Sequence, residues 1–102
     1  MVTLIQVPQF VAGLHSRVPR QKRRIYVMEW LKADGETVAE GEAVVVLNTV
    51  KAAVELTAEA SGFVFHLKEV DQDVKLYDVL GVLADSVEEF EEYRKQGLTH
   101  VA

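Results

Sequence analysis

The segment LNTVKAAV, residues 47–54, decides the fold, because strand-forming residues lead into a short polar turn and out of it again. Residues 43–47 before it are apolar and rich in valine, and residues 54–57 after it are also typical of a strand. Asn48 or Thr49 has a side chain that can open a turn by a hydrogen bond to the backbone. The segment therefore predicts a β-hairpin with Lys51 near its tip and exposed to solvent.

Length and composition indicate a single globular domain. The chain has 102 residues, of which 49% are hydrophobic and 26% are charged, as is ordinary for a protein with one modest core. Its formal net charge of −5 gives no reason to expect an affinity for nucleic acid. The absence of cysteine from the sequence excludes disulfides, thiolate catalysis and cysteine-based zinc sites.

The first residues do not have the pattern of an export signal. Residues 1–14 carry no basic leader, and Gln6, Pro8 and Gln9 interrupt their apolar character. Apolar runs in the chain reach about five residues, far short of the roughly 20 residues that a membrane-spanning helix needs. We therefore expect a cytoplasmic protein that does not enter a membrane.

Short segments with strand character recur along the chain. They are separated by turn signals such as Asp34-Gly35, Glu40-Gly41 and Ser61-Gly62. A series of such strands is typical of a small, all-β sandwich or barrel. The expected strands are residues 2–7, 25–32, 43–47, 54–57, 63–67 and 79–83.

An internal repeat relates two halves of this strand series. A shift of 36 positions lays residues 27–32, VMEWLK, on residues 63–68, FVFHLK. The repeat favours two sheets related by a quasi-two-fold axis. Under the same shift Lys51 falls on Val87, so the lysine hairpin belongs to one half only. We expect it at the end of the molecule opposite the chain termini.

Residues 86–96 predict a short C-terminal helix. Ser86 and Glu89 fit a capping box, acidic residues fill the first turn, and Gly97 is a suitable cap at the far end. The helix either packs on the barrel through its apolar residues or is a frayed tail, because so short a helix is marginal without packing. The apolar residues at three-residue spacing are Val87, Phe90 and Tyr93.

A basic segment, residues 16–24, follows a turn expected at Gly13 and contains Pro19. We call this segment the basic loop. It is either a solvated, flexible loop or a docking patch for an acidic partner surface, and phosphate binding fits less well with so acidic a chain. Its cationic residues are Arg17, Arg20, Lys22, Arg23 and Arg24.

Residues suited to catalysis are few and scattered. His15, His66 and His100 are isolated in the sequence, and His66 falls within a strand pattern, so they predict no metal site. The sequence has no serine in a nucleophile-elbow context and no glycine-rich phosphate loop. We therefore expect a protein that is not an enzyme on its own.

Three segments of the sequence also match three motifs that occur together in one protein family. Residues 30–42, WLKADGETVAEGE, fit Trp-Leu-x-x-x-Gly-Asp-x-Val-x-x-Gly in outline, and residues 48–56, NTVKAAVEL, fit Glu-Thr-Asp-Lys-Ala-x-x-Glu-Val. Residues 8–14, PQFVAGL, look like a degenerate Pro-x-x-Gly-Glu-Gly-Ile. Together they resemble the lipoyl domain of the biotinyl/lipoyl-attachment family, as found in acyltransferase components of 2-oxo acid dehydrogenase complexes.

Two glycines strengthen this resemblance. Gly35 lies 16 residues before Lys51 and Gly62 lies 11 residues after it, at the offsets that are usual in the family. We therefore expect a lipoyl-like domain at residues 1–85 that includes the basic loop as an insertion. A short helix and tail are expected at residues 86–102.

The resemblance implies a flattened β-barrel, or barrel-sandwich hybrid, of two four-stranded sheets with Lys51 at a hairpin tip. In the family, a lipoate ligase or lipoyl transferase joins lipoate to this lysine through an amide. The cofactor then carries acyl groups between active sites as a swinging arm, while the protein supplies position and recognition. The resemblance assigns the hairpin turn to Thr49, Val50 and Ala52, and the scaffold turns to Gly35 and Gly62.

The resemblance further implies a monomeric carrier that works with a thiamine-dependent 2-oxo acid dehydrogenase, an acyltransferase and a dihydrolipoamide dehydrogenase. In the family, the loop between the first two strands lies near the lipoyl hairpin and helps partners recognise it. The enlarged basic loop thus implies a dedicated partner or a neutral insertion. Because the sequence ends after the expected helix, we expect a free-standing carrier or a fragment of a dihydrolipoamide acyltransferase system.

The hairpin departs from the family at two positions, which keeps alternatives open. Val50 replaces the usual aspartate and Asn48 replaces the usual glutamate. Val-Lys-Ala also occurs in glycine-cleavage H proteins, whose N-terminal block does not match here. Biotin carboxyl carriers normally flank the lysine with methionines, so Val50 and Ala52 disfavour biotin. An unmodified barrel-sandwich interaction module is the remaining alternative.

Overall fold

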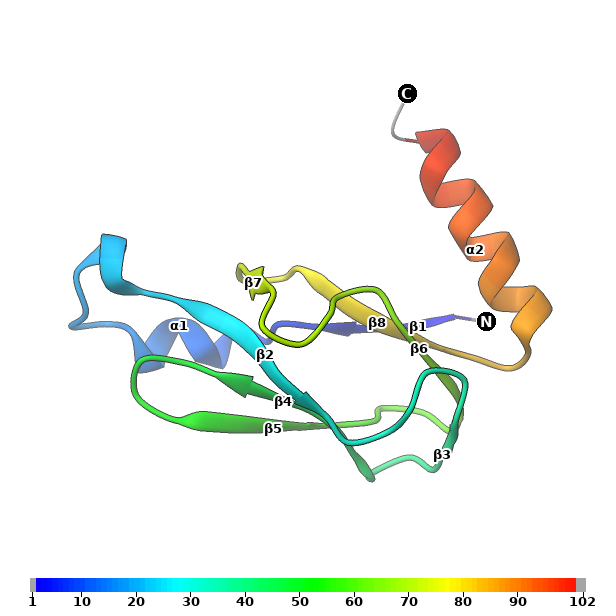
Figure 1. The fold of residues 1–102 in the computed structure, drawn as a ribbon, viewed down its shortest axis with the longest axis horizontal. Coiled ribbons are helices and arrows are strands. Elements are labelled where there is room, and N and C mark those ends of the chain that lie inside the picture. Colours follow the sequence, from blue (N-terminus) through cyan, green and yellow to red (C-terminus); the bar gives the residue numbers. More distant parts are fainter. Residues whose placement is uncertain (1, 101–102) are drawn as a thin grey trace.

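The computed structural model describes residues 2–100, with side chains described as far as residue 96. Its framework is two four-stranded antiparallel sheets with a helix after the last strand (Figure 1). This is the flattened, mostly β architecture that the sequence predicts. The elements in chain order are β1 (Thr3–Gln6), α1 (Phe10–Leu14), the 3-10 helix η1 (Arg20–Lys22), β2 (Ile25–Trp30), β3 (Thr37–Val38), β4 (Ala43–Asn48), β5 (Ala53–Thr57), β6 (Gly62–His66), β7 (Asp73–Val74), β8 (Val79–Ala84) and α2 (Val87–His100).

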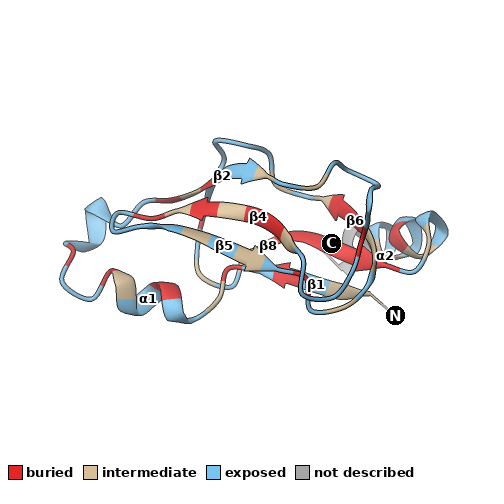
Figure 2. Cartoon of the chain, turned by 90° about the horizontal axis from the view of Figure 1, so that it is seen from below, coloured by how far each residue is buried: buried red, intermediate tan, exposed pale blue. Residues whose placement is uncertain are grey.

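The two sheets enclose a core built from aliphatic side chains. One sheet has the strand order β1-β8-β6-β3 and the other has the order β5-β4-β2-β7. Leu47 on β4 and Leu80 on β8 are fully buried, as are Val27 and Val64 on neighbouring strands. Burial of each such side chain contributes about 1.5–3 kcal/mol to folding. Figure 2 shows the buried residues, in red, concentrated along β4 and β8.

The 36-residue repeat of the sequence is also a repeat of the structure. The bounds of β4 and β8 differ by 36 positions at both ends, and so do those of β3 and β7. The same shift relates β2 to β6, and β5 takes the edge position in one sheet that β1 takes in the other. The two halves therefore have equivalent strand orders.

A stacked pair of rings joins these halves. Trp30 and His66, which the shift of 36 pairs, stack with ring centroids 3.8 Å apart and planes 13° apart. The Trp30 Nε1–H group donates to the Lys68 carbonyl at 2.9 Å, and His66 Nε2 lies 2.8 Å from the Lys32 carbonyl. Because Lys32 and Lys68 are paired by the same shift, the two contacts are reciprocal. This reciprocity confirms the predicted quasi-two-fold relation.

The connection from β1 to β2 differs in part from its prediction. Gly13 lies inside α1, so the turn predicted there is wrong. Val11 of α1 is completely buried in the core and holds this short helix against the sheets. The basic loop is a loop as predicted, with η1 in its middle. A five-residue helix anchored by one buried side chain leaves too short a pattern to be read from sequence.

The C-terminal helix packs against the outer face of β8. Phe90 is buried and its ring stacks on that of Phe65 with centroids 4.2 Å apart, while Tyr93 packs beside them. The prediction of a packed helix is therefore confirmed for these two residues. It is wrong for Val87, which is 52% exposed.

The two ends of α2 also differ from the prediction. The Ser86 hydroxyl accepts a hydrogen bond from the Glu89 N–H group at 3.1 Å, as a capping box requires. The Glu89 carboxylate, however, accepts from the Asp85 N–H group at 2.9 Å. Gly97 does not end the helix, which continues to His100. The side chain of His100 lies outside the described residues.

Candidate functional site

The predicted lysine hairpin is formed by β4 and β5. The last paired residues are Asn48 and Ala53, so residues 49–52 make a four-residue loop, which we call the Lys51 turn. In Figure 1 this loop, in green, lies beside α1 at one end of the molecule, and α2 lies at the other. The hairpin therefore lies opposite the end where β1 begins and α2 starts, as expected from the repeat.

Thr49 holds the Lys51 turn together. Its side chain is buried, and its hydroxyl donates to the Ala52 carbonyl at 2.8 Å. The same oxygen accepts from the N–H groups of Ala52 at 3.0 Å and Lys51 at 3.3 Å. The Thr49 N–H group also donates to the Ala52 carbonyl at 2.9 Å. Thr49, not Asn48, is thus the residue that opens the turn, whereas the Asn48 side chain donates to Met28 Sδ at 3.8 Å.

Lys51 and its two neighbours are exposed. The Val50 side chain is 49% exposed although it is apolar, and Ala52 on the other side is exposed as well. The Lys51 side chain therefore projects from a turn whose backbone is fixed while its flanking side chains are small or uncharged. A primary amine presented in this way is accessible to an enzyme that would acylate it.

His15, at the end of α1, contacts the Lys51 turn from a distant part of the sequence. Its side chain is only 3% exposed, and its Nε2 atom accepts a hydrogen bond from the Val50 N–H group at 3.2 Å. Acceptance at Nε2 requires the neutral ring with its proton on Nδ1. Burial, reinforced by the nearby positive charge of Arg23, lowers the pKa of His15 below its ordinary value of 6.5. In the sequence His15 is isolated, because 35 residues separate it from Val50 and no local pattern connects them.

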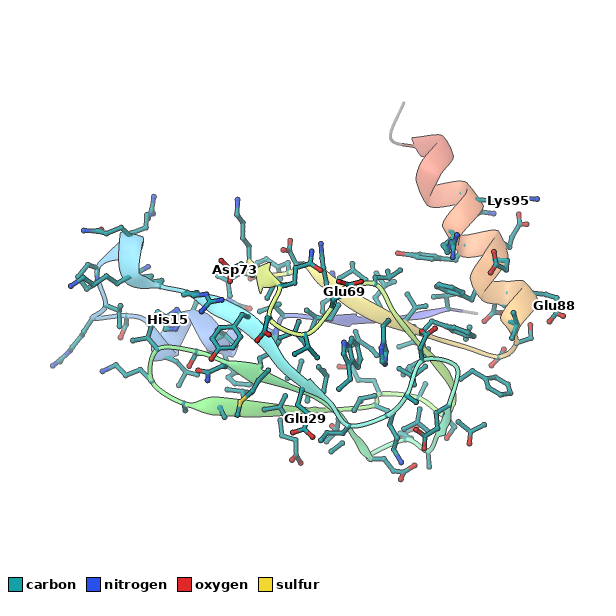
Figure 3. All side chains as sticks on the ribbon, in the orientation of Figure 1. His15, Glu29, Glu69, Asp73, Glu88 and Lys95 are labelled. Atoms are coloured by element: carbon teal, nitrogen blue, oxygen red, sulfur yellow. The ribbon has the colours of Figure 1, made fainter. Side chains whose placement is uncertain are left out.

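A cavity of about 550 Å³ lies next to His15. Ile25 and Val74 give it an apolar floor, since both are buried. Arg20, Arg23 and Lys75 also line it and are exposed, so its rim is positively charged. In Figure 3 His15 is labelled in this region, at the hairpin end of the molecule.

The fold brings the basic loop to the same end of the molecule as the Lys51 turn (Figure 1). Its cations are all exposed, but two of them have partners within the chain. Arg23 Nε donates to the Val18 carbonyl at 2.7 Å. Arg24 Nε pairs with Asp73 Oδ1 at 2.7 Å, and its guanidinium lies 4.1 Å from the centre of the Tyr26 ring. Of the five cations in the basic loop, the three best placed to contact a partner protein are therefore Arg17, Arg20 and Lys22.

Gly35 and Gly62 do not lie at the Lys51 turn. Gly35 lies between β2 and β3 with a φ of 86°, a left-handed conformation that favours glycine. Gly62 begins β6, and a Cβ atom there would lie 2.7 Å from the Ala84 carbonyl oxygen. Both glycines thus shape the pairing of β3 with β6, at the other end of the molecule from the hairpin tip (Figure 1).

The rest of the described chain offers no obvious second centre. Among the side chains that the structure describes, residues 2–96, no three histidine, cysteine, aspartate or glutamate side chains are grouped so that they could hold a metal ion. None of the helices within residues 2–100 combines the length and apolar character needed to span a membrane. His66 is occupied by its stacking on Trp30.

Comparison with known proteins gives two matches. Residues 17–83 match the biotin/lipoyl family model, described as "Biotin-requiring enzyme". The chain is also 36% identical over 64 residues to the "Dihydrolipoyllysine-residue succinyltransferase component of 2-oxoglutarate dehydrogenase complex" of Bacillus subtilis (strain 168). The matched segment is 62% of this chain and 15% of that relative, so the chain corresponds to a small part of the relative's length.

Proposed function

The chain belongs to the biotin/lipoyl family, whose members carry either cofactor on a lysine, and from this premise we propose that it is a lipoyl carrier modified at Lys51. The observation that carries the proposal is the exposed lysine in a four-residue turn fixed by the buried Thr49. Membership of a carrier family also supports a non-catalytic role for this domain.

The residues of the turn fit an amide-linked cofactor. The Thr49 hydroxyl fixes the backbone around Lys51, so the amine stands on a rigid support for the enzyme that modifies it. Val50 and Ala52 add no charge beside the amine. Lipoate bound there would supply a dithiolane that accepts acyl groups and electrons. The chain's own part is to hold this group away from its surface and within reach of its partners.

Two observations favour lipoate over biotin. Val50 and Ala52 flank Lys51 where biotin carriers usually have methionines. The succinyltransferase relative is named for a dihydrolipoyllysine residue and belongs to a 2-oxoglutarate dehydrogenase complex. We therefore infer that partners of this chain are the ligase or transferase that attaches lipoate and the three components of a 2-oxo acid dehydrogenase complex.

Intact-mass measurement of the protein from its native host tests the proposal. We expect a mass above that of the sequence by one lipoyl group, and we expect Lys51→Arg to remove this increment. Lys75→Arg is the matched control, because Lys75 is also exposed and lies in the connection between β7 and β8, and it should leave the increment unchanged. An increment of one biotinyl group would replace lipoate by biotin. An unmodified chain in a host with active ligase and lipoate would contradict the carrier function.

A further inference from the structure

We propose that His15 is a positioning residue for Lys51, because its neutral imidazole holds the Lys51 turn in the geometry that a modifying enzyme recognises. Protonation of His15 would release the turn. The consequence for modification rests on the proposed function of Lys51. The hydrogen bond itself can be tested on the unmodified protein.

The hydrogen bond from Val50 completes the turn. The N–H groups of Thr49, Lys51 and Ala52 find acceptors inside the turn, at the Ala52 carbonyl and the Thr49 hydroxyl. The N–H group of Val50 instead donates to His15 Nε2, which belongs to the segment after α1. Because Val50 directly precedes Lys51, this contact ties the Thr49–Val50 peptide unit, one residue before the lysine, to the buried part of the N-terminal segment.

The acceptor exists in one protonation state of the ring only. A protonated imidazole has an N–H group at both nitrogens, so Nε2 would face the Val50 N–H group without a lone pair. The proton would also enter a buried site that has Arg23 beside it and other cations nearby, while the acidic Asp73 is paired with Arg24. The cations that line the cavity beside His15 are Arg20 and Arg23 of the basic loop and Lys75 between β7 and β8. Protonation therefore breaks the bond and adds repulsion.

The direction of the pH dependence follows from this arrangement. The pKa of His15 lies below 6.5, first because the ring is buried and second because Arg23 is near. The unfolded chain consequently binds a proton more readily than the folded chain. The stabilisation by neutral His15 is complete above about pH 6.5, and it is lost as the pH falls from there through the folded-state pKa. The cavity beside His15 gives water and protons a route to the ring.

Amide hydrogen exchange and NMR titration of the unmodified 102-residue chain test the contact. His15→Leu introduces an apolar side chain of similar bulk that has no hydrogen-bond acceptor. His15→Gln provides an acceptor that does not titrate. We expect the Val50 amide to exchange about tenfold faster in His15→Leu than in the wild type, as fits the loss of one buried hydrogen bond. In the wild type, the Val50 amide shift should follow the His15 titration, and in His15→Gln it should not.

The rate of lipoate attachment by a lipoate ligase tests the positioning. The rate of the wild type divided by that of His15→Gln cancels the ligase's own pH dependence. We expect this ratio to be constant above pH 7 and to fall severalfold below pH 6.5, and we expect His15→Leu to be slow throughout. His66→Gln is the matched control, because His66 lies in the Trp30 stack away from the turn, and it should behave as the wild type.

The outcomes separate the two proposals. A Val50 amide that exchanges equally in the wild type and in His15→Leu would overturn the role of His15, whatever happens to Lys51. Equal and pH-independent attachment ratios would overturn it as well. If no variant accepts lipoate, including the wild type, the carrier function fails, and the exchange data still decide whether His15 holds the turn.

Discussion

The Thr49 hydroxyl is the side-chain group on which the geometry around Lys51 depends most directly. It serves one carbonyl and two N–H groups within four residues while the side chain is buried. Removal of this hydroxyl would leave the N–H groups of Lys51 and Ala52 without their acceptor in the turn and would take one donor from the Ala52 carbonyl. Within the Lys51 turn, three of the hydrogen bonds thus depend on this one oxygen atom.

We predict that Thr49→Val lowers the free energy of unfolding by about 1–2 kcal/mol, since it keeps the side-chain shape but removes the hydroxyl. Urea unfolding measures this change. Thr49→Ser retains the hydroxyl and should lose less stability. Equal stability of wild type and Thr49→Val would show that the turn does not depend on this oxygen.

Single residues mark the limit of what sequence can predict here. Gly35 and Gly41 signal turns, and both have positive φ angles. Their counterparts in the repeat, Asp71 and Tyr77, adopt the same conformation, with φ angles of 72° and 67°. Such a conformation costs roughly 1–2 kcal/mol for a residue with a side chain; aspartate tolerates it comparatively well, but a tyrosine would not be expected there. The surrounding strand pairing imposes it.

Among the elements, α2 and β8 depend on each other. β8 is buried along almost its whole length, because the sheet core covers one face and α2 covers the other. Phe90 makes this contact by stacking on Phe65 of β6, next to Val82 and Ala84 of β8. The helix thus protects an apolar patch that would otherwise face water.

We predict that Phe90→Ala lowers the free energy of unfolding by about 3 kcal/mol, because a large buried ring is lost. For a domain of this size, Tm should fall by more than about 10 °C in thermal unfolding. Glu91→Ala changes an exposed position on the same helix and serves as the control. Lipoate attachment at Lys51 should be unchanged in both variants below their Tm, since α2 lies at the opposite end of the chain's fold. A Phe90→Ala protein as stable as the control would contradict the packing role of α2.

Elements with a clear sequence pattern were predictable, and short ones were not. The six expected strands correspond to β1, β2, β4, β5, β6 and β8, each of which has a run of β-prone residues. β3 and β7 have two residues each, and α1 has five. Elements of this length carry no period of their own, so tertiary contacts such as the burial of Val11 determine them.

At the scale of the whole molecule, the repeat is the most informative pattern. It extends to small details: the Glu42 carboxylate accepts from the Ala39 N–H group at 2.7 Å, and the Asp78 carboxylate accepts from the Lys75 N–H group at 2.9 Å. Each member of one pair lies 36 positions from its counterpart in the other. The sequence predicted this symmetry, but the contact from His15 to Val50 lies in its asymmetric part and had no repeated partner to reveal it.

The basic loop gives one end of the molecule an exposed, positively charged surface, which we expect to suit an acidic partner. We predict that Arg17→Glu combined with Lys22→Glu lowers kcat/KM for reductive acylation by the cognate dehydrogenase about tenfold at low salt. The difference should shrink as salt is added, because exposed charges are screened. Both side chains are exposed, and Arg23 and Arg24 are kept because they have partners within the chain.

The control for this prediction carries the same charge change elsewhere. Lys68→Glu combined with Arg94→Glu alters positions outside the basic loop, and it should leave kcat/KM near the wild-type value. Equal losses in the two double variants would mean that only net charge matters. No loss in either would leave the basic loop as a neutral insertion.

The separation of charge between the two ends makes the molecule an electric dipole. Cations gather beside the Lys51 turn, while the first turn of α2 at the opposite end carries Glu88 and Glu89 (Figure 1). A net charge of −5 repels the chain from an acidic surface as a whole, but the dipole produces a torque that turns its hairpin end toward that surface. For a carrier oriented in this way, we expect less of each encounter to be spent in unproductive rotation, so that the association rate depends on alignment as well as on attraction.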